Sequence, residues 1–148
     1  MSQPEVTRVP PHSKEAEMSV LGALMLDRDA VIAIAEFLLP EHFYDEKHKR
    51  IYKAILGLYE KRNPIDVLTV SEELKTQKTL KEVGGASFLA ELSNSVPTAS
   101  HVEHYGRIVK EHAVKRSLMA AAAKLFDLSM DESLASGDLL DKAESEVF

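Results

Sequence analysis

The sequence contains no cysteine and no tryptophan among its 148 residues. The lack of cysteine excludes disulfide bonds, thiol catalysis and zinc sites built on cysteine. The longest apolar stretch, residues 30–39, is interrupted by Glu36 and is too short to cross a bilayer. The N-terminal residues lack the apolar segment of a secretory signal. We therefore expect a cytoplasmic protein without a membrane contact.

Positive charge is in the minority, with 18 Lys and Arg against 24 Asp and Glu and a formal net charge of −6. Such a chain has no overall attraction for phosphate backbones, which disfavours a general nucleic-acid coat protein. None of the six glycines fits the spacing of a Walker or Rossmann phosphate loop, and no nucleophile elbow is present. We expect no cofactor, no catalytic residue and no enzymatic activity in this chain.

Glycine and proline are scarce, with six of each, and they fall between segments whose apolar residues recur at helical spacing. No segment alternates with a period of two for long enough to predict a strand. We therefore predict an all-α fold of helices joined by short turns, broken at Gly84 and Gly85. The predicted N-caps are Ser13, Asp27, Asp45 and Asp66, with capping boxes at residues 79–82 and 100–103.

Residues 100–128 contain no proline and predict one long helix of about 43 Å, too long to stay within a compact domain of this size. A turn at 129–137 and an acidic amphipathic helix at 138–148 should complete an antiparallel helical hairpin. Residues 101–127 carry five basic and three acidic side chains, whereas 129–148 carry six acidic side chains and one lysine. The opposite charges favour pairing of the two arms.

The predicted organisation has three parts. Residues 1–11 form a flexible arm, residues 12–97 a compact helical head, and residues 98–148 a protruding hairpin. A return helix of about eleven residues cannot cover a long helix whose apolar side chains spread over more than one face. The uncovered surface predicts self-association or partner binding. The candidate residues are Val109, Leu118, Met119, Ala122, Leu125 and Phe126 on the long helix and Leu139 and Leu140 on the return helix.

Met119 and Leu125 differ by about 240° around a helix, so at least one of them should face away from the return arm. Four basic residues, Arg107, Lys110, Lys115 and Arg116, are candidates for weak contacts with DNA. Pairing with the acidic return helix together with ordinary solvation is the favoured alternative for these cations.

Histidines and acidic pairs supply the remaining candidates. His101, His104 and His112 share part of one helix and could hold zinc in a helical metal-dependent hydrolase. Glu103 and Glu111 point away from the first two, which favours ordinary surface histidines and no metal site. The pairs Glu15 and Glu17, and Glu72 and Glu73, are assigned to helix capping and solvation, since adjacent helical positions diverge.

Several short segments, taken together in order and spacing, resemble the N-terminal domain of bacterial replicative DNA helicases of the DnaB family. The match is collinear from Val9 to Phe148. It includes residues 9–17 (VPPHSKEAE), 19–23 (SVLGA), 26–27 (LD), 43–44 (FY), His48, 51–52 (IY), 64–66 (PID), 73–74 (EL), 84–92 (GGASFLAEL), 96–99 (VPTA), Tyr105, 108–109 (IV) and Arg116.

The resemblance implies a helical head and a hairpin that pairs two subunits, with three pairs forming a collar on a hexameric ring. It also implies recruitment of primase, for which we expect apolar contacts from Phe88, Met119 and Leu125. A helicase loader is a further candidate partner. The family's ATPase, with its ATP and magnesium, lies in a separate C-terminal domain that this sequence lacks. The helicase-binding C-terminal domain of primase, which is similar in fold, is the alternative.

Overall fold

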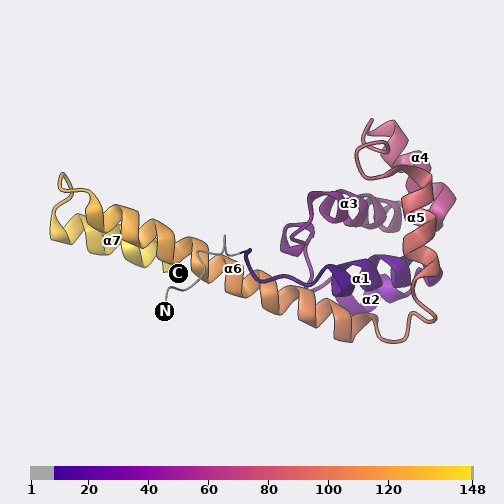
Figure 1. The fold of residues 1–148 in the computed structure, drawn as a ribbon, viewed down its shortest axis with the longest axis horizontal. Coiled ribbons are helices and arrows are strands. Elements are labelled where there is room, and N and C mark those ends of the chain that lie inside the picture. The colour runs from indigo at the N-terminus through magenta and orange to yellow at the C-terminus, as the bar shows by residue number, and fades with distance from the viewer. Residues whose placement is uncertain (1–8, 148) are drawn as a thin grey trace, which may run out of the picture. The chain divides into compact units, whose positions relative to one another are not determined.

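The computed structural model describes residues 9–147, and every regular element among them is helical (Figure 1). The all-α prediction is confirmed. The elements are α1 (Lys14–Leu26), α2 (Ala30–Ile34), the 3-10 helix η1 (Pro40–His42), α3 (Glu46–Glu60), α4 (Val67–Thr76), α5 (Gly85–Asn94), α6 (Val102–Met130) and α7 (Ser136–Val147). Residues 1–8 of the predicted arm lie outside the described residues.

Three of the predicted N-caps hold the first turns of their helices. The side chain of Ser13 accepts the Ala16 N–H at 3.1 Å, and that of Asp45 accepts the Lys47 N–H at 2.8 Å. The Asp66 carboxylate accepts the N–H of Thr69, also at 2.8 Å. Each carboxylate or hydroxyl satisfies one of the backbone donors that a helix start leaves unpaired.

Other predicted boundaries are wrong. Asp27 ends α1, and α2 begins only at Ala30 after Asp29. The long helix begins at Val102 and continues to Met130, so its start and end both lie two residues beyond the predicted ones. By contrast, residues 80–84 form the short turn predicted after α4, in which the Val83 N–H donates to the Thr79 carbonyl at 3.2 Å and the Thr79 hydroxyl donates to the Leu74 carbonyl at 3.4 Å.

The head consists of residues 12–113 and is organised around α1. This helix packs against α2, α3 and α5, while α4 packs against α3 and α5. Gly22 permits the closest approach, because a β-carbon there would lie 2.3 Å from the backbone carbonyl oxygen of Leu92 in α5. A larger residue at position 22 would force these two helices apart.

The head extends well beyond the predicted boundary at residue 97. Val102 and Val109, both in the first half of α6, are 4% and 1% exposed and belong to the head's hydrophobic core. Gly106 lies between them, and a β-carbon there would lie 3.1 Å from Ile34. The first three turns of α6 are therefore part of the head, a fact that helical periodicity alone does not reveal.

A second unit contains residues 9–11 and 114–147. Within it, α7 runs back along the C-terminal part of α6 (Figure 1). The two arms are joined by an ion pair between Lys124 Nζ and Glu146 Oε1, 2.7 Å apart. The predicted antiparallel hairpin of opposite charges is present here.

Candidate protein-interaction surfaces

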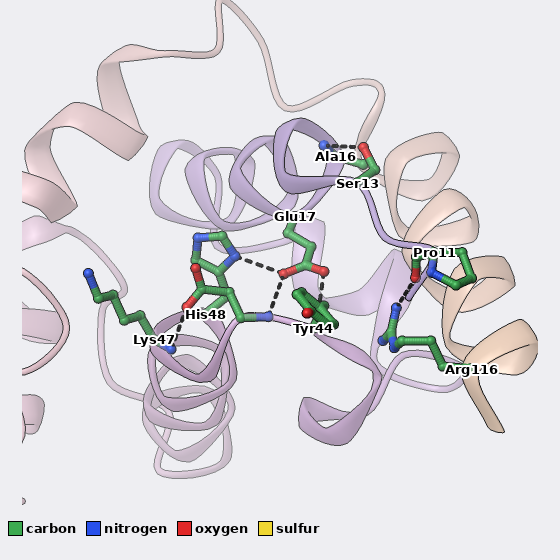
Figure 2. A network of polar contacts seen from close by, with 9 residues as sticks. Pro11, Ser13, Ala16, Glu17, Tyr44, Lys47, His48 and Arg116 are labelled. Carbon is green, nitrogen blue, oxygen red and sulfur yellow. Dashed lines mark hydrogen bonds and ion pairs between the residues drawn. The ribbon is translucent and has the colours of Figure 1, made fainter. Parts of the chain in front are cut away.

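Glu17 is buried in the head, where it joins α1 to the start of α3 (Figure 2). Its Oε2 accepts the Tyr44 N–H at 2.9 Å, and its Oε1 accepts the Asp45 N–H at 3.3 Å and lies 2.8 Å from His48 Nδ1. A carboxylate can only accept, so Nδ1 of His48 carries the proton in this contact. The prediction of solvation is wrong for Glu17, whereas helix capping is observed, at the start of α3 instead of at its own helix.

This network is structural. The carboxylate takes up two backbone donors at the N-terminal end of α3, where a helix favours negative charge. Glu15, two residues earlier on α1, is exposed and has no such partners. Nothing in the network is open to a substrate, since both Glu17 and His48 are about 1% exposed.

Two further titratable groups have shifted pKa values. Burial raises the pKa of the Tyr52 phenol, whose hydroxyl donates to the Leu38 carbonyl at 2.8 Å inside the head. Hydrogen bonds from the side chain and backbone of Ser133 lower the pKa of the exposed Asp131 carboxyl. The Tyr52 hydroxyl thus has a hydrogen-bond partner inside the core, and the Asp131 carboxylate stabilises the turn between α6 and α7.

The most exposed apolar surface of the hairpin lies along one ridge of α6, which we call the α6 stripe. The stripe consists of Val114, Leu118, Ala122, Phe126 and Met130. Each residue follows the last by four positions, the spacing that forms a continuous ridge on a helix. Leu118, Phe126 and Met130 are 63%, 67% and 69% exposed. The return helix leaves this ridge uncovered.

The other predicted contact residues of the hairpin fall into two groups. Leu125 and Leu139 are half-buried within the hairpin, whereas Met119 and Leu140 are exposed. Of the pair Met119 and Leu125, Met119 is therefore the residue whose side chain is open to solvent. Val147, at the end of α7, adds a further exposed apolar side chain.

Two predicted contact residues lie in the head. Val109 is buried in the core, so it has no surface to offer a partner, and its inclusion among the contact residues was wrong. Phe88 is half-buried against the same core, with its ring parallel to that of His48 and the ring centroids 6.3 Å apart. The exposed part of Phe88 leaves it available for a contact.

Most of the predicted DNA-contacting residues are engaged within the chain. Arg107 lies over the Phe37 ring, 3.9 Å from its centroid, and forms an ion pair with Glu103 one turn away. Lys110 Nζ lies 3.2 Å from His42 Nε2, and Arg116 Nη1 donates to the Pro11 carbonyl oxygen at 2.8 Å, while Lys115 is exposed. None of these contacts is made with the return helix α7.

The histidines named from the sequence are not brought together as a metal site. His101, just before α6, and His104, on its first turn, are exposed, and His112 is half-buried. Among residues 9–147, no three His, Cys, Asp or Glu side chains are grouped to hold a metal ion. No helix in the same range is long and apolar enough to cross a membrane.

Comparison with known proteins identifies the family. Residues 9–111 match the model of the DnaB-like helicase N terminal domain. The replicative DNA helicase DnaB of Geobacillus stearothermophilus is 40% identical over 147 residues, which are 99% of this chain and 32% of that protein. The replicative DNA helicase DnaC of Bacillus subtilis (strain 168) is 39% identical over 95% of this chain and 31% of its own length. The chain thus spans about a third of these relatives.

Solved structures agree with the sequence comparison. The crystal structure of the N-terminal domain of DnaB helicase from Mycobacterium tuberculosis has a TM-score of 0.89 and 37% identity, over 94% of this chain and 97% of that one. A DnaB-like replicative helicase studied with its interactions with primase has a TM-score of 0.74 at 24% identity, over 91% of this chain and 31% of that one, a likeness of fold. The helicase assignment therefore holds over the primase alternative, and the chain belongs to the DnaB-like helicase N-terminal domain family.

Proposed function

We propose that this chain is the protein-interaction domain of a hexameric replicative helicase of the cytoplasm. In this proposal two hairpins pair, three pairs form a collar, and the collar recruits primase. ATP hydrolysis and DNA unwinding would belong to a further domain of the intact protein, which binds ATP and magnesium. The observation that carries the proposal is the exposed α6 stripe.

An exposed apolar ridge of this length on a protein surface is typical of a contact site. Pairing of two identical hairpins about a two-fold axis would bury each stripe against another copy as a four-helix bundle. The head, by contrast, has a hydrophobic core of its own around α1. Substitutions in the stripe should therefore weaken self-association and leave the folding of the head unchanged.

Analytical ultracentrifugation of variants tests this pairing. Leu118→Asp and Phe126→Asp place charge on the stripe and should each weaken association, since an interface anchor contributes about 1–4 kcal/mol. Ile32→Asp is the matched control, because Ile32 is 62% exposed on α2 in the head. Unchanged association of the Leu118→Asp, Phe126→Asp double variant would exclude the stripe as the interface.

Primase recruitment is the second part of the proposal. It is supported by the family and by the exposed surface of Met119 and half-exposed Phe88. Met119→Asp should weaken binding of a primase C-terminal domain while the circular dichroism spectrum and Tm stay unchanged. Full binding by a folded variant that carries Phe88→Ala, Met119→Asp and Leu125→Asp would place the contact elsewhere.

DNA and a loader complete the proposed set of partners. DNA binding by this domain should be weak and should fall steeply with salt, since the chain is acidic and two of the four candidate cations, Lys110 and Arg116, are half-buried and engaged within the chain. Nanomolar DNA affinity at physiological salt would contradict this expectation. A helicase loader, if it contacts this domain, is expected to use the same exposed apolar surface.

A further inference from the structure

A groove of about 880 Å³ lies between α4 and the start of α5, within the head. Its apolar lining comes from Val67 and Leu68 on α4, Leu80 in the following turn and Ala86 on α5. Leu68 is 68% exposed, so it contributes little to the head's own core. The opposite side of α4 supplies the core contacts, through Val70 and Leu74.

Three lysines border this groove. Lys75, Lys78 and Lys81 all line it and are exposed, and Glu72 is the one acidic residue in the lining. None of the three ammonium groups forms an ion pair with another residue in the range 9–147. The groove therefore combines an apolar floor with a positively charged edge, in a chain whose net charge is negative.

The charge and shape of the groove define what fits it. We propose that the α4–α5 groove binds a short amphipathic segment of another protein, apolar on one face and rich in Asp and Glu beside it. A helix laid along the ten residues of α4 would contact it over about 15 Å, or two to three turns. Carboxylates flanking its apolar face would meet the lysines at the edge.

The acidic α7 of a second copy fits this groove less well than a segment of another protein. The inward side of α7 is already used, with Leu139 and Ala143 half-buried and Glu146 paired with Lys124. Leu140 and Val147 remain exposed and, seven residues apart, share one face of α7, but two large apolar side chains are fewer than the apolar lining of the groove can contact. The proposal is independent of hairpin pairing and goes beyond the function proposed above.

A pair of designed peptides tests the proposal on the full chain. The probe is a helical peptide of about 15 residues with leucines at i, i+3, i+4 and i+7 and glutamate at the flanking positions, labelled for fluorescence anisotropy. Its partner carries lysine at every glutamate. The acidic peptide should bind at least about tenfold more tightly than the basic one, and the preference should shrink as salt rises. NMR shifts in the ¹⁵N-labelled chain should fall within residues 67–86.

Surface variants locate the site. Leu68→Glu and the double variant Lys75→Glu, Lys81→Glu should each weaken binding of the acidic peptide by about tenfold or more. Matched controls are Ile32→Glu for the exposed leucine and Lys47→Glu, Lys53→Glu for the lysines, all exposed elsewhere on the head. Should Leu68→Glu lose its fold, seen in the near-UV circular dichroism, the exposed Ala86→Glu replaces it.

Three outcomes overturn the proposal. The first is absence of binding by the acidic peptide, or equal binding by the basic one. The second is equal loss of binding in the control variants. The third is weaker self-association of Leu68→Glu or Ala86→Glu in ultracentrifugation, which would make a second copy the occupant. Because the groove variants leave the α6 stripe intact, these results are separate from those that test hairpin pairing.

Discussion

The two halves of α6 differ more than their sequences suggest. In the head, Val109 is 1% exposed and belongs to the hydrophobic core, whereas Leu118 in the hairpin is 63% exposed. Both are aliphatic side chains in the middle of the same continuous helix. Burial therefore depends on which elements surround a stretch of helix. The surrounding helices of the head bury Val109, whereas the single return helix of the hairpin leaves Leu118 exposed.

The largest effect should come from the buried carboxylate of the head. Glu17→Ala removes the acceptor for two backbone N–H groups and leaves His48 without its partner, which should lower the free energy of unfolding by about 3–5 kcal/mol. All four tyrosines lie in the head, so near-UV circular dichroism follows its urea unfolding alone. The control, exposed Glu15→Ala, should stay within about 0.5 kcal/mol. Equal effects of the two substitutions would contradict the capping role.

A second test compares the two halves of α6 directly. Val109→Ala deletes two buried methyl groups and should destabilise the head by about 2–3 kcal/mol, including the cavity that remains. Leu118→Ala should change the same unfolding transition by about 0.5 kcal/mol or less. If Leu118→Ala destabilised the head as much as Val109→Ala, the division at residue 113 would be wrong.

A third test uses two glycines that lie within helices of the head. Gly22→Ala should destabilise it by about 1–3 kcal/mol, because the new methyl group would collide with the Leu92 carbonyl. Gly57→Ala in α3 meets no atom within 4 Å and should stabilise the head by about 0.5–1 kcal/mol. Opposite shifts in Tm are the expected result, and shifts of the same sign would refute the close approach of α1 and α5.

The smallest effect should come from the ion pair of the hairpin. Lys124 and Glu146 have side chains that are 59% and 28% exposed, so solvent weakens their attraction. A double-mutant cycle with Lys124→Ala and Glu146→Ala should give a coupling energy of about 0.2–1 kcal/mol that falls with salt. Far-UV circular dichroism measures the hairpin's melting. A coupling energy as large as the effect of Glu17→Ala would mean that the hairpin is held by charge.

Local signals in the sequence predicted local structure well. Ser13, Asp45 and Asp66 cap helices because their side chains bond to backbone groups two or three residues away, which a sequence pattern can specify. The apolar periodicity likewise predicted the long helix and its return arm. The short turn between α4 and α5 was also predicted, from Thr79 and the two glycines that follow it.

Long-range contacts could not be predicted in this way. Glu17 lies 27 to 31 residues from its three partners, and nothing in its own neighbourhood distinguishes it from Glu15. The burial of Val109 depends on α6 packing over Gly106 against α2, which no pattern within α6 reveals. The α6 stripe was anticipated in part, through Leu118, Ala122 and Phe126. Its continuation to Val114 and Met130 required the observed course of the return helix.

Because α6 is unbroken from Val102 to Met130, one helix passes from a fully packed environment into an open one. Amide hydrogens near Val109 can exchange with solvent only when the head opens as a whole, whereas those near Phe126 need only a local opening of the hairpin. Hydrogen–deuterium exchange along this helix should therefore change from slow to fast near Ala113. The residue at which the exchange rate changes marks the C-terminal limit of the head. When a partner covers the stripe, the slow exchange should extend further towards the C-terminus of α6.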